Sequence, residues 1–153
     1  MGNGCISPRI TAATSITIST AFLPAVERVT NTPDLSERGM VPGGADGLIA
    51  FSIKKKSEAQ ANLAVLATDG SVRVLTAEAD PDYEWSPRIW ADGGKTIYAL
   101  RDKVDSTTTE IWRVDVASGK ATKVLAQPNT IFRLADVSPD GKWLAVTTDM
   151  EIG

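Results

Sequence analysis

The residue types that could do chemistry gather in one acidic and aromatic stretch. Asp80-Pro81-Asp82-Tyr83-Glu84 carries three carboxylates at alternate positions, an oxygen-rich pattern of the kind that calcium prefers. An EF-hand loop would need glycine where Trp85 stands and glutamate where Ala91 stands, so a solvated acidic loop is the better interpretation. Trp85 combines apolar area with one hydrogen-bond donor, which suits a peptide or a sugar. Trp90 and Trp112 are expected to pack inside the protein.

The residue types that the chain lacks exclude several kinds of catalytic and metal site. Its 153 residues include no histidine and one cysteine, Cys5, so neither a Ser-His-Asp nor a Cys-His nucleophile system can be built within it. Zinc sites made from His and Cys and an intramolecular disulfide are also excluded. No Gly-rich phosphate loop and no G-x-S-x-G elbow occurs. A carboxylate-only glycosidase stays open, but no pair of carboxylates stands out, and we expect a non-enzymatic protein without a cofactor.

Charge and hydropathy bear on partners and location. A net charge of −3 gives no electrostatic reason to expect nucleic acid as a partner. No run of about 18 apolar residues is present, so we expect no membrane span. The segment 10–23 is interrupted by hydroxyl residues and alternates around Ile16 and Ile18, which favours a strand over a signal peptide. Residues 1–13 are expected to be a flexible terminus, and periplasm and cytoplasm stay open as locations.

The chain repeats itself with a period of about 47–50 residues, within the range of propeller blades. Gly47, Gly94 and Gly141 are spaced 47 residues apart, and the apolar runs that follow them align. The segment 61–66 corresponds in the same way to 109–114, which lies 48 residues later. These matching spacings indicate one structural unit that recurs along the chain.

Each unit is expected to contain three or four short strands joined by turns. Asp69-Gly70, Ser118-Gly119 and Asp140-Gly141 are tight-turn pairs in which glycine supplies a positive φ. The flanking segments carry β-branched and aromatic residues that often alternate with polar ones. For the middle unit the expected strands are 95–101, 109–116 and 121–126. Long helical periodicity is absent, so the predicted fold class is all-β.

A family resemblance gives these units an architecture. Val137-Ser138-Pro139-Asp140-Gly141-Lys142-Trp143-Leu144-Ala145 closely resembles the blade signature of the TolB-like, or WD40-like, β-propeller repeat, where Ser-Pro-Asp-Gly-Lys joins the innermost strand to the second. The segment 87–98 looks like a second copy in which Ala91-Asp92 replaces Ser-Pro, and 110–115 resembles the third strand. The resemblance covers residues 46–150. Similar repeats occur in periplasmic TolB, in the propeller domain of prolyl-oligopeptidase-type enzymes and in binding proteins.

The resemblance implies about three blades, whereas closed propellers usually have four to eight. Residues 14–153 would form a partial β-propeller. Its expected parts are an outer half-blade at 14–30, blades at 40–76 and 85–126, and an inner half-blade at 131–150. Three accounts stay open: a fragment of a longer propeller protein, a homodimer in which complementary half-blades close a six-blade ring, and an open three-blade stack.

As a function, the resemblance implies a non-catalytic binding or scaffold module for protein or peptide, with neither nucleic acid nor membrane as partner. The alternative is the propeller part of a prolyl-oligopeptidase-type serine hydrolase whose catalytic domain is missing here. Binding is expected at one end of the inner strands, near the connections 40–46, 79–87 and 127–131. The expected ligand or partner face consists of Asp80, Asp82, Tyr83, Glu84, Trp85, Arg88, Asn129 and Arg133.

Overall fold

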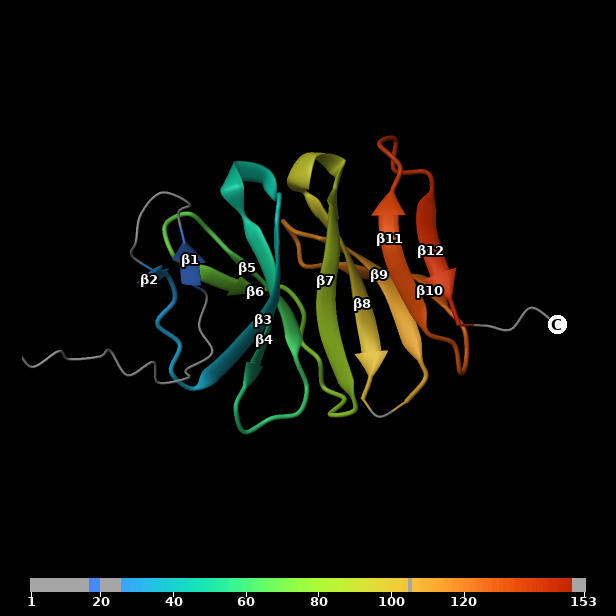
Figure 1. The fold of residues 1–153 in the computed structure, drawn as a ribbon, viewed down its shortest axis with the longest axis horizontal. Helices are drawn as coiled ribbons and strands as arrows, with labels where there is room; N and C mark the ends of the chain where they lie inside the picture. Colours follow the sequence, from blue (N-terminus) through green and yellow to red (C-terminus); the bar gives the residue numbers. More distant parts are fainter. Residues whose placement is uncertain (1–16, 20–25, 105, 150–153) are drawn as a thin grey trace, which may run out of the picture.

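The computed structural model describes residues 17–19, 26–104 and 106–149 (Figure 1). The expected flexible terminus 1–13 lies outside the described residues, as does most of the signal-peptide candidate 10–23. The described part of the chain is all-β, with twelve strands and two single-turn 3₁₀ helices. This agrees with the fold class that the strand and turn pattern predicts.

The strands form antiparallel sheets in which each strand pairs with its neighbours in sequence. The first sheet contains β3 (Leu35–Pro42), β4 (Ile49–Lys55), β5 (Asn62–Leu66) and β6 (Val72–Val74). The second contains β7 (Tyr83–Ala91), β8 (Thr96–Lys103), β9 (Thr109–Asp115) and β10 (Ala121–Ala126). The third contains β11 (Phe132–Val137) and β12 (Leu144–Thr148), and an N-terminal hairpin contains β1 (Thr17–Ser19) and β2 (Val26–Arg28).

These sheets stack face to face along the long axis of the molecule, with the N-terminal hairpin at one end and the third sheet at the other (Figure 1). Ala50 and Val65 of the first sheet meet Ile97 and Val114 of the second in one buried core. A second core joins the second and third sheets, and a third covers the far face of the first sheet. Because both faces of β4 and β5 are covered, their sequences are nearly continuous apolar runs rather than alternating ones.

The first strand of the first sheet begins earlier than its sequence suggests. The blade that contains it was expected to begin at residue 40, yet β3 starts at Leu35. Its pairing with β4 is interrupted between Arg38 and Val41, where Gly39 takes a φ of +67°, and this bulge breaks the alternation that marks a strand. The segment 40–46 therefore contains the end of this strand, and it lies at the opposite edge of the sheets from the connections that precede β7 and follow β10 (Figure 1). The expectation that all three connections share one face is wrong.

The first two sheets are in close contact at the 3₁₀ turns Ala45–Gly47 and Asp92–Gly94. The Trp90 indole Nε1 donates to the Val41 carbonyl at 2.8 Å, and its ring covers Gly44, where a Cβ would lie 2.6 Å from a ring carbon. A Cβ on Gly94 would lie 2.5 Å from the Gly44 carbonyl carbon. Only glycine allows this close approach of two backbones.

The structure shifts one repeat alignment by a residue. Asp46 and Gly47 have φ angles of +56° and +76°, and their conformational counterparts are Asp92 and Gly93, at +52° and +65°, which lie 46 residues later. The 47-residue spacing from Gly47 to Gly94 is therefore not the structural equivalence.

The strands that follow also depart from a 47-residue spacing. Under that spacing Ala50 would match Ile97, but these two residues face each other across the same core. Ile49 packs on the face away from the second sheet, as Ile97 points away from the third, and the strand pairs Ile49–Leu66 and Ile97–Val114 are 48 residues apart. A one-residue slip exchanges the two faces of a strand because the side-chain period is two. The 47-residue spacing does hold between Ile97 and Leu144, since Leu144 faces the second sheet.

Candidate functional site

An open hollow of about 310 Å³ lies at one end of the second sheet. This is the end at which the β8–β9 hairpin loop and the β10–β11 connection are found. We call it the ligand hollow. Its lining residues are Tyr83, Lys103, Thr108, Glu110, Ala126, Gln127, Pro128 and Asn129. Tyr83 and Asn129 belong to the face expected from the sequence, and the fold brings them together from segments more than 40 residues apart.

Beside the hollow an ionic network crosses the second sheet. The Arg101 guanidinium donates from Nε and Nη2 to the two carboxylate oxygens of Glu78, at 2.7 and 3.0 Å. Its Nη1 donates to Glu110 at 3.2 Å, and Lys123 Nζ donates to the other oxygen of Glu110 at 2.6 Å. Both carboxylates are almost fully buried, so each acid is neutralised where it has lost contact with water.

Aromatic residues pack around this network. The Arg101 guanidinium lies 3.5 Å from the centre of the Tyr83 ring, a cation–π arrangement. The indoles of Trp85 and Trp112 donate to Glu78 and Glu110, each at 2.8 Å. The two indole rings meet edge to face with their centroids 5.4 Å apart. On the wall of the hollow, Tyr83 thus packs against a guanidinium that Glu78 and Glu110 hold in place.

Trp85 does not face a ligand as the sequence suggested. Its side chain belongs to the core between the first two sheets, and the residue is 5% exposed. Its position beside a polar turn makes it look accessible in sequence, but alternation along β7 directs it toward the first sheet. Trp90 and Trp112 pack against the same core, as expected.

The charges of the network are maintained at neutral pH. Hydrogen bonds from Arg101 are the largest cause that holds the pKa of Glu78 below its usual value of 4.5. Burial by itself would raise the pKa of Glu110, but hydrogen bonds from Lys123, Trp112 and Arg101 outweigh burial and lower that pKa. The pKa of Arg101 is raised, chiefly by its bonds to Glu78. These carboxylates are therefore suited to holding strands together, since a general acid or base needs a pKa near the working pH.

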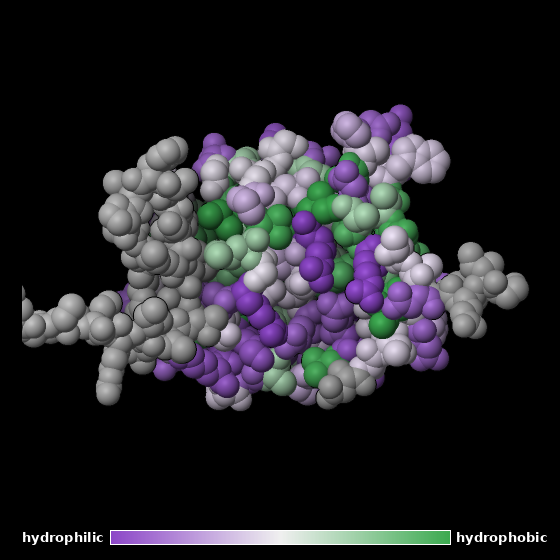
Figure 2. Space-filling model, viewed as in Figure 1, coloured by the Kyte–Doolittle hydropathy of each residue, from purple (hydrophilic) through white to green (hydrophobic). Residues whose placement is uncertain are grey.

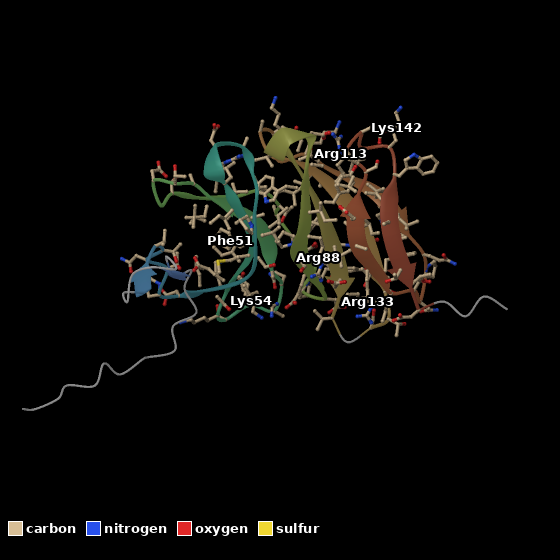
Figure 3. All side chains as sticks on the ribbon, turned by 45° about the horizontal axis from the view of Figure 1, so that its top comes forward. Phe51, Lys54, Arg88, Arg113, Arg133 and Lys142 are labelled. Atoms are coloured by element: carbon tan, nitrogen blue, oxygen red, sulfur yellow. The ribbon has the colours of Figure 1, made fainter. Side chains whose placement is uncertain are left out.

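A second group of charges lies where β7 passes the first sheet. Glu84 accepts a hydrogen bond from Arg38 at 2.5 Å and lies 3.8 Å from Lys54 Nζ, so it ties β7 to β3 and β4. Arg88 is exposed at the residue where the β7–β8 pairing shifts register. Lys54, Arg88 and Arg133 follow one another from sheet to sheet in Figure 3. Hydrophilic residues also cross the middle of this side of the molecule in Figure 2.

Asp102 differs from the carboxylates of the network because its pKa is raised. Burial is the largest cause and raises its pKa above the usual 3.8, although the Thr109 hydroxyl donates to it at 2.8 Å and Arg88 lies near enough to lower it. The charged form is thus less favoured here than in water, because an opposite charge and one hydrogen bond compensate only part of the lost hydration.

The other expected residues lie elsewhere. Asp80 and Asp82 occupy an exposed turn, in which an Asp80 side-chain oxygen accepts from the Asp82 backbone N–H at 3.0 Å. Arg133 of β11 is exposed and lies 3.4 Å from Asp149. The expected face is thus divided among the hollow, the core, an exposed turn, and the strands β7 and β11.

The hollow also contains residues that sequence reasoning did not select. Lys103, Thr108 and Ala126 line it, and Glu110 pairs directly with Arg101 across the β8–β9 hairpin. The opposite charges of Arg101 and Glu110 offered a signal, because facing cross-strand residues commonly pair in this way. Using that signal requires the hairpin register, which the turn sequence alone does not specify.

Within residues 17–19, 26–104 and 106–149, no group of three or more acidic or cysteine side chains is arranged to hold a metal ion. None of the helices in this part of the chain is long and apolar enough to cross a membrane. In comparisons with known proteins, the chain matches no family model and no curated protein. A function for this chain therefore has to be argued from the geometry of the site.

Proposed function

We propose that the chain consists of β-propeller blades of the TolB-like type and serves as a non-catalytic module that binds a segment of protein or peptide. Two four-stranded meanders stacked face to face support the blade architecture. The Ser138–Trp143 turn supports it too. Ser138 Oγ donates to Asp140 and accepts from the Trp143 N–H at 3.0 Å, and Gly141 has a φ of +68°.

The ligand hollow is the observation that carries the binding role. Its volume lies at the lower end of the range for ligand sites, about 300–1,000 Å³, and suits one or two peptide side chains. Gln127 and Asn129 can pair with peptide N–H and C=O groups, while Tyr83 and Pro128 provide flat apolar surface. Such a mixture of amide and aromatic groups matches a polypeptide.

Charge selects the kind of peptide. Glu110 is occupied by Lys123 and Arg101, whereas Lys103 forms no ion pair with another described residue. The cation available to a ligand is therefore Lys103, and we propose a peptide that presents a carboxylate to it. A partly desolvated ammonium–carboxylate contact also gives specificity over a neutral peptide.

Amide-resolved NMR titration tests this function. The probes are a pool of acetylated pentapeptides that contain one Asp or Glu and a matched pool with Asn or Gln. The acidic pool should shift amides at residues 83, 103, 108–110, 126, 127 and 129 most strongly, and Lys103→Gln should weaken this response. Lys120→Gln removes the same charge from an exposed turn outside the hollow and should leave it unchanged. Shift changes that avoid the hollow, or equal responses to both pools, would contradict the proposal.

A further inference from the structure

The outer face of the third sheet exposes residues at positions that are buried in the sheet before it. Trp143 is 75% exposed, and Ala145 and Thr147 on the same face are exposed as well. Their equivalents 47 residues earlier are Thr96, Tyr98 and Leu100, which are 2%, 7% and 4% exposed.

The difference has a direct cause. Tyr98 and Leu100 are buried in the core that the second sheet forms with the third. The same holds one sheet earlier, because Ala50 of β4 is buried against the second sheet. Each of these faces is thus covered by the next sheet in the stack. The Trp143 face is a sheet-packing surface without its covering sheet in the described part of the chain.

The edge of β12 also lacks a partner strand within the described part of the chain. In the first and second sheets, β4 and β8 each pair with a strand on both sides, whereas β12 pairs with β11 alone among the described strands. An edge of this kind is a ready template for strand addition. The N-terminal hairpin is likewise a two-stranded sheet. Each of these two small sheets thus has half as many strands as the first or the second sheet.

We infer that a second copy of this chain completes the third sheet. The N-terminal hairpin of the second copy adds its strands to β12, and the first sheet of that copy covers Trp143. The hairpin of the same chain cannot do this, because it lies at the opposite end of the stack (Figure 1). Two such exchanges close a two-fold dimer of six four-stranded sheets, two complete ones from each copy and two composite ones.

The contact area is sufficient for a stable dimer. The strands of the third sheet have six and five residues, so one face is about 18 Å long and about 10 Å wide. A closed dimer contains this junction twice and buries both surfaces at each, so face packing removes about 700 Å². The projecting Trp143 ring can bury about 150–250 Å² in each copy. Together with strand pairing this exceeds the roughly 1,000 Å² of a specific interface.

Size-exclusion chromatography with light scattering tests the inference on the whole chain between 10 and 100 µM. The wild type should have about twice the monomer mass of 16.3 kDa. Trp143→Asp and Ala145→Arg should shift it to the monomer, with dimer affinity reduced at least about tenfold. Val124→Asp alters an exposed apolar residue of β10, away from this face, and should remain dimeric. Circular dichroism verifies that each variant is folded.

Three outcomes would overturn the inference: a monomeric wild type at 100 µM, a Trp143→Asp variant that stays dimeric, or open-ended larger assemblies. The inference rests on the stacking of the sheets and not on the peptide site. A monomeric Trp143→Asp variant can be titrated with the acidic peptide pool, so failure of the dimer and failure of the ligand hollow are separate results.

Discussion

The contact between the two 3₁₀ turns predicts different effects for alanine at two adjacent glycines. Gly93 and Gly94 both have positive φ, at +65° and +83°. A Cβ on Gly93 would meet nothing within 4 Å, whereas one on Gly94 would lie 2.5 Å from the Gly44 carbonyl carbon and closer still to the Ala45 nitrogen. Gly93→Ala thus isolates the conformational cost, and Gly94→Ala adds a collision between two backbones.

The expected magnitudes follow from these two contributions. A left-handed conformation costs a non-glycine residue about 1–2 kcal/mol, so Gly93→Ala should lower the free energy of unfolding by about 1 kcal/mol. Forcing extra atoms into a packed region costs about 1–3 kcal/mol more, so Gly94→Ala should lose about 2–4 kcal/mol. A third variant, Gly44→Ala, has an ordinary φ of −68° but places its Cβ 2.6 Å from the Trp90 ring. It should lose about 1–3 kcal/mol through sterics alone.

Urea unfolding followed by circular dichroism and tryptophan fluorescence measures these losses, and coincident curves justify a two-state treatment. In thermal melts, each kcal/mol corresponds to about 2–4 °C for a chain of this size. Gly93→Ala should then melt about 3 °C below the wild type and Gly94→Ala about 10 °C below. Equal losses for Gly93→Ala and Gly94→Ala would refute the close approach of the first two sheets.

Three further substitutions test the site and its surroundings. Because Arg101 lowers the pKa of Glu78, the carboxylate stabilises the fold above pH 4.5 and loses this effect as the pH falls through its folded pKa. Glu78→Gln should therefore cost about 2 kcal/mol at pH 7, and urea melts should show the difference from the wild type shrinking below pH 4.5. Burial raises the pKa of Asp102, so this residue favours the folded state less as the pH rises above 3.8. Asp102→Asn should match the wild type near pH 3 in the same assay and be more stable at pH 7; an advantage that persists at pH 3 would contradict this. Trp90→Phe removes the indole bond to the Val41 carbonyl and should cost about 1–2 kcal/mol in urea melts, whereas an unchanged midpoint would argue against that contact.

Local sequence patterns were sufficient to predict strands β8, β9 and β10 of the second sheet. The expected strands 95–101, 109–116 and 121–126 lie within two residues of β8, β9 and β10. Here β-branched residues alternate, and Ser118-Gly119 closes the turn with Gly119 at a φ of +72°. By contrast, the bulge at Gly39 obscured the start of β3, because an interrupted ladder has no regular period to detect.

The candidate site was only partly predictable for a different reason. Tyr83 and Asn129 were selected from the sequence, but Lys103 and Thr108 were not, because the hollow exists only where separate connections converge. Trp85 was assigned to the surface although it lies in the core. A tryptophan beside polar residues can lie at the surface or in the core. Trp85 is buried because the first sheet packs against it.

By itself the sequence determined the all-β class, the turns and the recurrence of a unit of about 48 residues, since each depends on residues close together in the chain. The absence of histidine likewise ruled out whole classes of catalytic centre. Only the tertiary structure decided that Ile49, and not Ala50, corresponds to Ile97, and that Trp143 is exposed where Thr96 is buried. When both faces of a strand are apolar, its sequence is consistent with either orientation, and only contacts between distant segments choose one.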